Sequence, residues 1–228
     1  MGVHILITKL PKWVEIGAFT LSILAGSVNT IGLVGFSHHT LSHFTGTISE
    51  LGVQVVNFDW MISLHLGMIL LSFFVGTIFS GYYIKNSALK LGRRYGVALL
   101  MEGILLILAM LFLKSGSQVG CYFASGACGL QNAMVTTYSG AVIRTTHITG
   151  LLTDLGIMFG ARFRGISFDK RLAVLYLIIL TGFMFGSIIG AVGFNVIGFD
   201  AFVIPTTLAI GLSVIYWFYL RQHENSTK

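Results

Sequence analysis

The chain has 228 residues, of which 55% are hydrophobic and only 10% are charged, with 28 glycines and two prolines. Soluble domains carry about 25% charged residues, so this composition excludes an ordinary soluble domain and indicates a protein embedded in a membrane. The formal net charge of +6 is explained by basic loops on one side of that membrane rather than by binding to nucleic acid.

Six apolar windows predict the membrane crossings, because a spanning helix needs about 20 predominantly apolar residues. Four windows are almost purely apolar, and two contain more small and polar residues. The first window does not belong to a cleavable signal, because its apolar run is too long for one. We therefore predict an all-α polytopic membrane protein, with a single transmembrane domain over residues 1–228 and a polar cytoplasmic tail at 222–228. In chain order, the windows cover roughly residues 16–36, 62–84, 95–113, 118–142, 172–194 and 202–220.

A ten-residue motif occurs twice between these windows. HFTGTISELG covers residues 43–52 and HITGLLTDLG covers residues 147–156, so His, Thr, Gly, an acid, Leu and Gly recur at the same spacing. The helices expected from Gly46 to about Val56 and from Gly150 to about Gly160 offer roughly 15 Å each, half the hydrocarbon thickness. Irregular backbone reaches membrane depth only where it is buried in protein or lines water. We therefore predict two re-entrant half-helices, with helices lying flat on the membrane surface as the alternative.

The basic residues predict which side of the membrane each loop occupies. With six crossings, and two segments that enter and return on the same side, all 14 lysines and arginines except Lys114 share one side. Positive loops stay in the cytoplasm, so both termini are expected there. Three crossings per repeat place the second repeat upside down relative to the first. The sequence thus predicts an inverted-topology 3+3 repeat, with repeat one at about 13–114 and repeat two at about 117–221.

Two stretches give the chain a specific family resemblance. LAGSVNTIGLVGFSHHTLSHFTGTISELG at 24–52 and RTTHITGLLTDLG at 144–156 resemble the YoaK-like (UPF0700) family of bacterial multipass membrane proteins, and the similarity covers essentially the whole chain. The resemblance implies a protein of the bacterial inner (plasma) membrane with about six spans. The family is a domain of unknown function, so the activity has to be inferred from the residues themselves.

The paired steps Thr45-Gly46 and Thr149-Gly150 stand at the start of the expected half-helices. The first amides of a helix lack partners and its macrodipole leaves about half a positive charge there, so two such ends meeting near the membrane midplane suit an anion or a polar solute. Threonine can also cap these amides and glycine permits close packing, so a purely structural role is the alternative. His43 and His147 could donate to an anion or relay a proton. The expected solute-binding residues are His43, Thr45, Gly46, His147, Thr149, Gly150, Asn29 and Asn132.

Four charged residues are expected to tune charge or couple protons, because ionisable groups within a membrane are costly and usually functional. Glu50 and Asp154 lie four residues beyond each glycine, although Glu50 could instead complete a capping box with Thr47. Glu102 lies about two turns inside the third window and could couple protons or pair with a neighbouring helix. Arg144 could hold an anion or extend to the cytoplasmic surface.

These residues favour a small membrane transporter or channel-like permease for a small anionic or polar solute, bound at the midplane between inverted repeats. The alternatives are an intramembrane metal-dependent enzyme using His38, His39 and His43, and a structural or regulatory membrane protein. The sequence has no HExxH or GxSxG motif, so we expect no catalytic residue, metal or cofactor. The expected partners are the lipid bilayer and the solute. A small-residue stripe permits close packing within the chain or a homodimer through Gly182, Gly186 and Gly190.

Overall fold

The computed structural model describes residues 13–35, 42, 44–84, 93–167 and 169–226. Within these residues every regular element is helical and no strand is present, which confirms the predicted all-α class for this part of the chain. The elements are α2 (Trp13–Gly35), α3 (Phe44–Val56), α4 (Trp60–Tyr83), α5 (Arg93–Lys114), α6 (Val119–Ser139), α7 (Ile148–Phe163), α8 (Lys170–Ile197), the 3-10 helix η1 (Gly198–Phe202) and α9 (Val203–Ser226).

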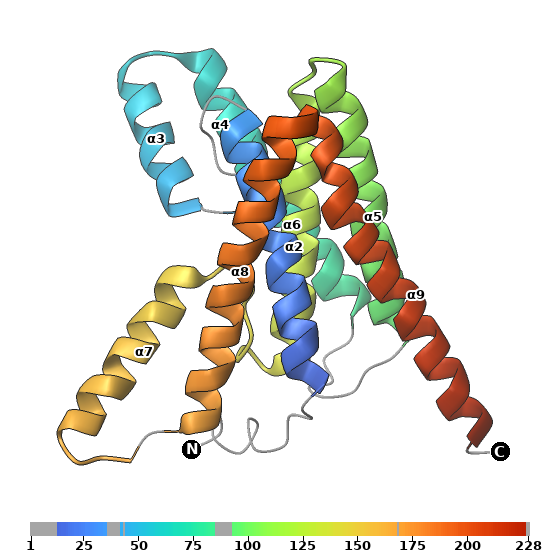
Figure 1. The fold of residues 1–228 in the computed structure, drawn as a ribbon. Helices are drawn as coiled ribbons and strands as arrows, with labels where there is room; N and C mark the ends of the chain where they lie inside the picture. The colour runs from blue at the N-terminus through green and yellow to red at the C-terminus, as the bar shows by residue number, and fades with distance from the viewer. Residues whose placement is uncertain (1–12, 36–41, 43, 85–92, 168, 227–228) are drawn as a thin grey trace.

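Four stretches of the described residues are long and apolar enough to cross a membrane, namely α2, α4, α5 and the 52-residue stretch Lys170–Arg221. This last stretch contains two helices, because Gly198 adopts a positive φ of 59° and η1 reverses the chain between α8 and α9 (Figure 1). A left-handed backbone of this kind favours glycine. α6 has 21 residues and therefore the length to cross, but it is richer in small and polar residues. The structure thus supports a helical membrane protein.

Two pairs of helices pack so closely that glycine is required at their contacts. A Cβ atom on Gly186 of α8 would overlap the carbonyl oxygen of Ile23 on α2, and one on Gly26 of α2 would overlap the carbonyl oxygen of Phe183. The α4–α6 pair has the same character, because a Cβ on Gly76 would overlap the carbonyl oxygen of Gly126. Small residues at such contacts let helix backbones approach each other within a membrane.

The stripe of Gly182, Gly186 and Gly190 lies against α2 of the same chain. Of the two arrangements that the sequence permitted, the structure therefore uses this stripe for packing within the chain. A homodimer through the stripe stays an untested prediction, and it would have to share a face that α2 already covers. α2–α8 and α4–α6 are accordingly the most extensive helix contacts of the described residues.

Buried polar side chains join other helices. The hydroxyl of Ser125 on α6 donates to the carbonyl oxygen of Ile69 on α4 at 2.9 Å, and that of Ser213 on α9 donates to Gly96 on α5 at 2.7 Å. The side-chain amide of Gln131 donates at 2.8 Å to a carbonyl oxygen of α2. Such bonds satisfy polar groups that lipid could not solvate, so they fix the relative positions of the helices.

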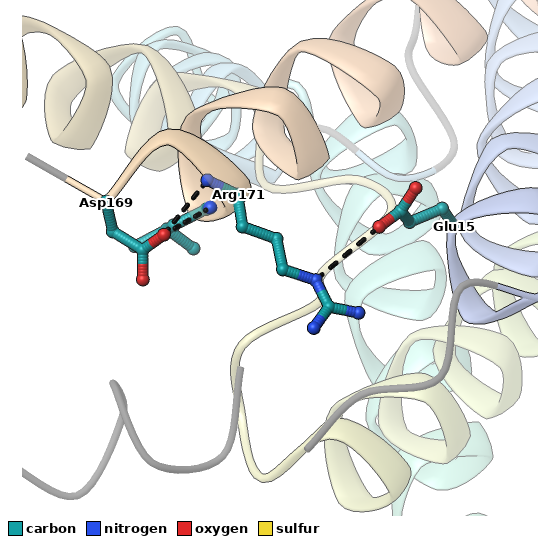
Figure 2. A network of polar contacts seen from close by, with 4 residues as sticks. Glu15, Asp169 and Arg171 are labelled. Carbon is teal, nitrogen blue, oxygen red and sulfur yellow. Dashed lines mark hydrogen bonds and ion pairs between the residues drawn. The ribbon is translucent and has the colours of Figure 1, made fainter. Parts of the chain in front are cut away.

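Charged contacts lie at the two ends of the bundle. Asp169 caps α8 by accepting bonds from the backbone N–H groups of Arg171 at 2.9 Å and Leu172 at 3.2 Å. Figure 2 shows the side chain of Arg171 reaching from this cap to Glu15 at the start of α2, with 3.7 Å between Nε and Oε1. At the opposite end, Lys114 and Asp200 form an ion pair at 2.6 Å. These contacts tie α8 to α2 at one end and α5 to η1 at the other.

Candidate functional site

Two helices of the structure are too short to cross a membrane. α3 has 13 residues and α7 has 16, so they measure about 20 Å and 24 Å against a hydrocarbon core of about 30 Å. Both begin about half-way along the long helix α8 and run in opposite directions from there (Figure 1). α3 packs on α4, whereas α7 packs on α8. The two copies of the motif thus begin short helices whose N-terminal ends lie toward each other.

A cavity of about 730 Å³ lies where these two helices begin. Its walls come from the starts of α3 and α7, from the segment that precedes α7, and from the facing sides of α4 and α6. Eight of the seventeen lining residues are serine or threonine, and one arginine, one histidine and one aspartate add charged or titratable groups. The lining residues are Ser42, Phe44, Thr45, Phe73, Thr77, Asn132, Ala133, Thr136, Thr137, Arg144, Thr146, His147, Ile148, Thr149, Gly150, Thr153 and Asp154.

Seven residues expected to form or tune a site lie together in this cavity. Thr45 comes from the first copy of the motif, and residues of the second copy lie around it. Several of these side chains are exposed, including those of Thr45, Thr149 and Asp154, so the cavity is open on one side. The seven residues are Thr45, Asn132, Arg144, His147, Thr149, Gly150 and Asp154.

The other expected residues have different positions. Asn29, Gly46, Glu50 and Glu102 are not among the described residues that line the cavity. His43, which was expected to match His147, lies outside the described residues, as do His38 and His39 of the suggested metal site. Within the residues that the structure describes, no group of three His, Cys, Asp or Glu side chains could hold a metal ion.

Each copy of the motif contains the same local hydrogen bond. The hydroxyl of Ser49 donates to the carbonyl oxygen of Thr45 at 3.0 Å, and the hydroxyl of Thr153 donates to that of Thr149 at 2.9 Å. Serine and threonine commonly bond to the carbonyl four residues earlier in a helix. The sequence match therefore extends to the conformation of the helix start.

The helix starts also correct two details of capping. α7 begins at Ile148, so its N-cap is His147, which makes no side-chain capping bond, and Thr149 lies inside the first turn. α3 begins at Phe44, so Thr47 lies a turn inside the helix and cannot be the N-cap of a capping box with Glu50. The error has one cause: the sequence pattern placed both helix starts two residues too late.

Gly150 leaves room for the side chain of His147. A Cβ atom on Gly150 would overlap Nδ1 of the histidine ring, so the imidazole folds back over the first turn of α7. This contact explains the spacing of histidine and glycine in the second copy of the motif. The same ring lines the wall of the cavity.

Asn29 supports the cavity from outside. Its Oδ1 atom accepts bonds from the backbone N–H of Ser42 at 3.2 Å and from the Ser42 hydroxyl at 2.9 Å. Ser42 lines the cavity just before α3. Asn29 is only 9% exposed, so this contact gives it a positioning role.

Arg144 and Asp154 bring opposite charges to one cavity. Within the described residues they form no ion pair with each other, and both lie near the hydroxyl of Tyr176 on α8. Tyr176 is 6% exposed and is buried in the core. Sequence analysis missed Tyr176, because an aromatic residue in an apolar window gives no signal of contact with a segment more than 20 residues away.

Glu102 occupies a different part of the bundle. Its side chain is fully buried on α5, close to Cys128 on α6, and neither carboxyl oxygen has a hydrogen-bond partner among the described residues. The Oε1 atom of Gln131 is also buried without a partner. A carboxyl group in such surroundings is stable only in its neutral form, because an isolated buried charge is very costly.

A second cavity, of about 430 Å³, lies between α2, α5, α6 and α9 and has an apolar lining with several tyrosines. It contains none of the residues singled out from the sequence. Its tyrosines Tyr95, Tyr138, Tyr216 and Tyr219 come from three helices and show no common spacing.

No curated protein and no solved structure matches the chain. The model of a family described as "Protein of unknown function (DUF1275)" matches residues 17–215. That range includes both copies of the motif and all four helices around the larger cavity. The resemblance to YoaK-like proteins is consistent with this match. The chain therefore belongs to the DUF1275 family of proteins of unknown function.

Proposed function

We propose that the protein is a small membrane transporter or channel-like permease, and that a small anionic or polar solute binds in the cavity between α3 and α7. One observation carries the proposal: Thr45 and Thr149, from the two copies of the motif, line the same polar cavity. The two threonines are 104 positions apart (149 − 45), so only the tertiary fold brings them to one cavity. Transporters built from repeats commonly bind substrates where broken helices of the two halves meet.

The helix contacts support an inverted 3+3 repeat. The first helix of each proposed half packs on the second full-length helix of the other half, as α2 with α8 and α6 with α4. Glycines make both contacts possible, through Gly186 in one pair and Gly76 in the other. In this arrangement α2, α4, α5, α6, α8 and α9 cross the membrane, and α3 and α7 are the re-entrant half-helices.

The charge distribution supports the orientation. The Arg171–Glu15 contact and the C-terminal end of α7, with Arg162 and Lys170, lie at one end of the bundle, whereas Lys114 lies at the opposite end. By the positive-inside rule the first end faces the cytoplasm of a bacterial inner membrane. Both chain termini then lie in the cytoplasm.

The wall of the cavity has the chemistry that the proposal needs. The N-terminal turn of α7 presents backbone N–H groups and the positive end of a helix dipole, and Arg144 adds a fixed positive charge. Threonine hydroxyls and Asn132 can donate and accept hydrogen bonds. Asp154 lies in the wall of the cavity and would contact the solute, whereas Glu102 lies outside the cavity wall and is suited to hold a proton. Glu50, on α3 but not at the cavity wall, would act only through its charge.

Transport by purified protein in liposomes tests the proposal. Vesicles containing the wild type should take up small polar or anionic solutes faster than protein-free vesicles. The double variant Thr45→Val and Thr149→Val should reduce uptake about tenfold, because it removes hydroxyls from both halves of the site, a loss of about 1.4 kcal/mol.

Thr181→Val provides a matched control, because Thr181 is an exposed residue of α8 whose hydroxyl bonds only within its own helix. Its uptake should equal that of the wild type. If no solute enters faster than into protein-free vesicles, or if the double variant transports as well as the control, the proposed site is wrong.

A further inference from the structure

We infer that the solute is a zwitterion of the α-amino acid class, with a carboxylate and an ammonium group on one small molecule. The inference rests on the proposed function and names the substrate class of that same cavity. It comes from the presence of Arg144 and Asp154 in one wall without an ion pair between them. Each charge is therefore open to a ligand group of the opposite sign.

The carboxylate end of the ligand faces the start of α7. The first intrahelical bond there runs from the N–H of Leu151 to the carbonyl of His147 at 3.2 Å, so the three preceding amides have no acceptor within the helix. His147, at the N-cap, supplies no side-chain acceptor. Ile148, Thr149 and Gly150 line the cavity. A carboxylate can accept from these amides and from the Arg144 guanidinium together.

The ammonium end faces Asp154. This residue lies one turn beyond Gly150, about 6 Å further along the helix axis. The Tyr176 hydroxyl lies beside its carboxylate and also near Arg144, so the two charged groups share one neighbour. The carboxylate of Asp154 can therefore accept from the ammonium group of a small ligand. The amides at the start of α7 and the Arg144 guanidinium can donate to the carboxylate at the ligand's other end.

Other classes of solute match the wall less well. A simple anion would satisfy Arg144 but be repelled by Asp154, and a simple cation would meet the reverse problem. A neutral polyol would leave both charges without a counter-charge at membrane depth, where unpaired charges are costly. A zwitterion neutralises both groups at once, and the hydroxyls of Thr45, Thr146 and Thr153 can bond the remaining polar atoms.

Four probes of similar size and different charge test the inference in proteoliposomes. Radiolabelled alanine carries both charges, lactate only the negative one and ethanolamine only the positive one, and glycerol serves as a neutral probe. The wild type should take up alanine at least tenfold faster than each of the other three. Unlabelled serine should compete with alanine, and unlabelled lactate should not.

Charge-removing variants should change the selectivity rather than only lower the rate. Asp154→Asn should lose at least tenfold in alanine uptake and gain lactate uptake, because the repulsion is gone. Arg144→Gln should lose alanine uptake and gain ethanolamine uptake. Asp200→Asn and Arg164→Gln are matched controls, since both residues lie outside the cavity lining, and both should retain alanine selectivity.

The gain of a new substrate shows that a variant is folded. A wild type that transports lactate, ethanolamine or glycerol in preference to alanine overturns the zwitterion and leaves the transporter proposal standing. Unchanged selectivity in Asp154→Asn or Arg144→Gln also overturns the zwitterion. If none of the four probes moves and none binds the purified protein, the proposed function itself fails.

Discussion

The side-chain oxygen of Asn29 on α2 accepts two hydrogen bonds from Ser42, one from its backbone N–H at 3.2 Å and one from its hydroxyl at 2.9 Å. Ser42 is part of the cavity wall and stands two residues before α3. A residue in the C-terminal half of α2 therefore fixes the backbone from which one half of the site begins.

Replacing Asn29 by leucine should destabilise the protein by about 1–3 kcal/mol, because the N–H and hydroxyl of Ser42 would both remain buried without a partner. Ser42→Ala removes only one of the bonds and should cost about 1 kcal/mol. The two changes should be strongly non-additive, since they act on one contact. Thermal unfolding in detergent of the single and double variants measures this coupling.

Ser22→Ala is the control for that cycle. Ser22 is also buried on α2, but its hydroxyl bonds to Ala18 of the same helix at 2.7 Å. Combined with Asn29→Leu, it should give an additive loss. Additivity of Asn29→Leu with Ser42→Ala as well would show that the contact does not stabilise the fold.

Gly186→Leu should destabilise the chain by about 3 kcal/mol or prevent folding, because even a Cβ atom there overlaps the carbonyl oxygen of Ile23. Gly81→Leu on α4 should be close to neutral, since nothing lies within 4 Å of its Cβ position. Unfolding temperature and the yield of monodisperse protein measure the difference. A Gly186→Leu protein with normal stability and a changed oligomeric mass would instead support the homodimer predicted from the stripe.

Cysteine labelling should reveal the six-crossing topology. Asn57→Cys and Ser115→Cys should react with a membrane-impermeant maleimide in intact spheroplasts, whereas Ser167→Cys should react only after lysis. All three positions are exposed, and the native Cys121 and Cys128 are buried and should give little background. Labelling of Ser167→Cys in intact spheroplasts would contradict the proposed orientation, and protection of Asn57→Cys would contradict a re-entrant α3.

Glu102→Gln should leave the fold intact or slightly more stable, because the amide has nearly the same shape and carries no charge to bury. If Glu102 couples protons, uptake driven by a pH gradient should be lost while exchange of labelled for unlabelled solute continues. Both activities can be measured in the same proteoliposomes. Retention of gradient-driven uptake would exclude Glu102 from proton coupling.

The sequence by itself determined the helical membrane class and the approximate position of each long helix. The predicted window 62–84 corresponds to α4 (Trp60–Tyr83), and 95–113 corresponds to α5 (Arg93–Lys114). It also indicated that the helices beginning within the two motifs are too short to span. These properties depend on composition and on hydrophobic runs within one segment, so they can be read locally.

Only the tertiary structure decided which of the candidate residues meet. Thr45 and Asp154 line one cavity. Glu102 is also an acid expected within the membrane, but it is buried on α5 away from that cavity. Tyr176 lies beside Asp154 and Arg144 without any sequence signal, and Gly186 packs against α2. The physical reason is that such contacts join segments many residues apart, and close packing of whole helices sets their distances.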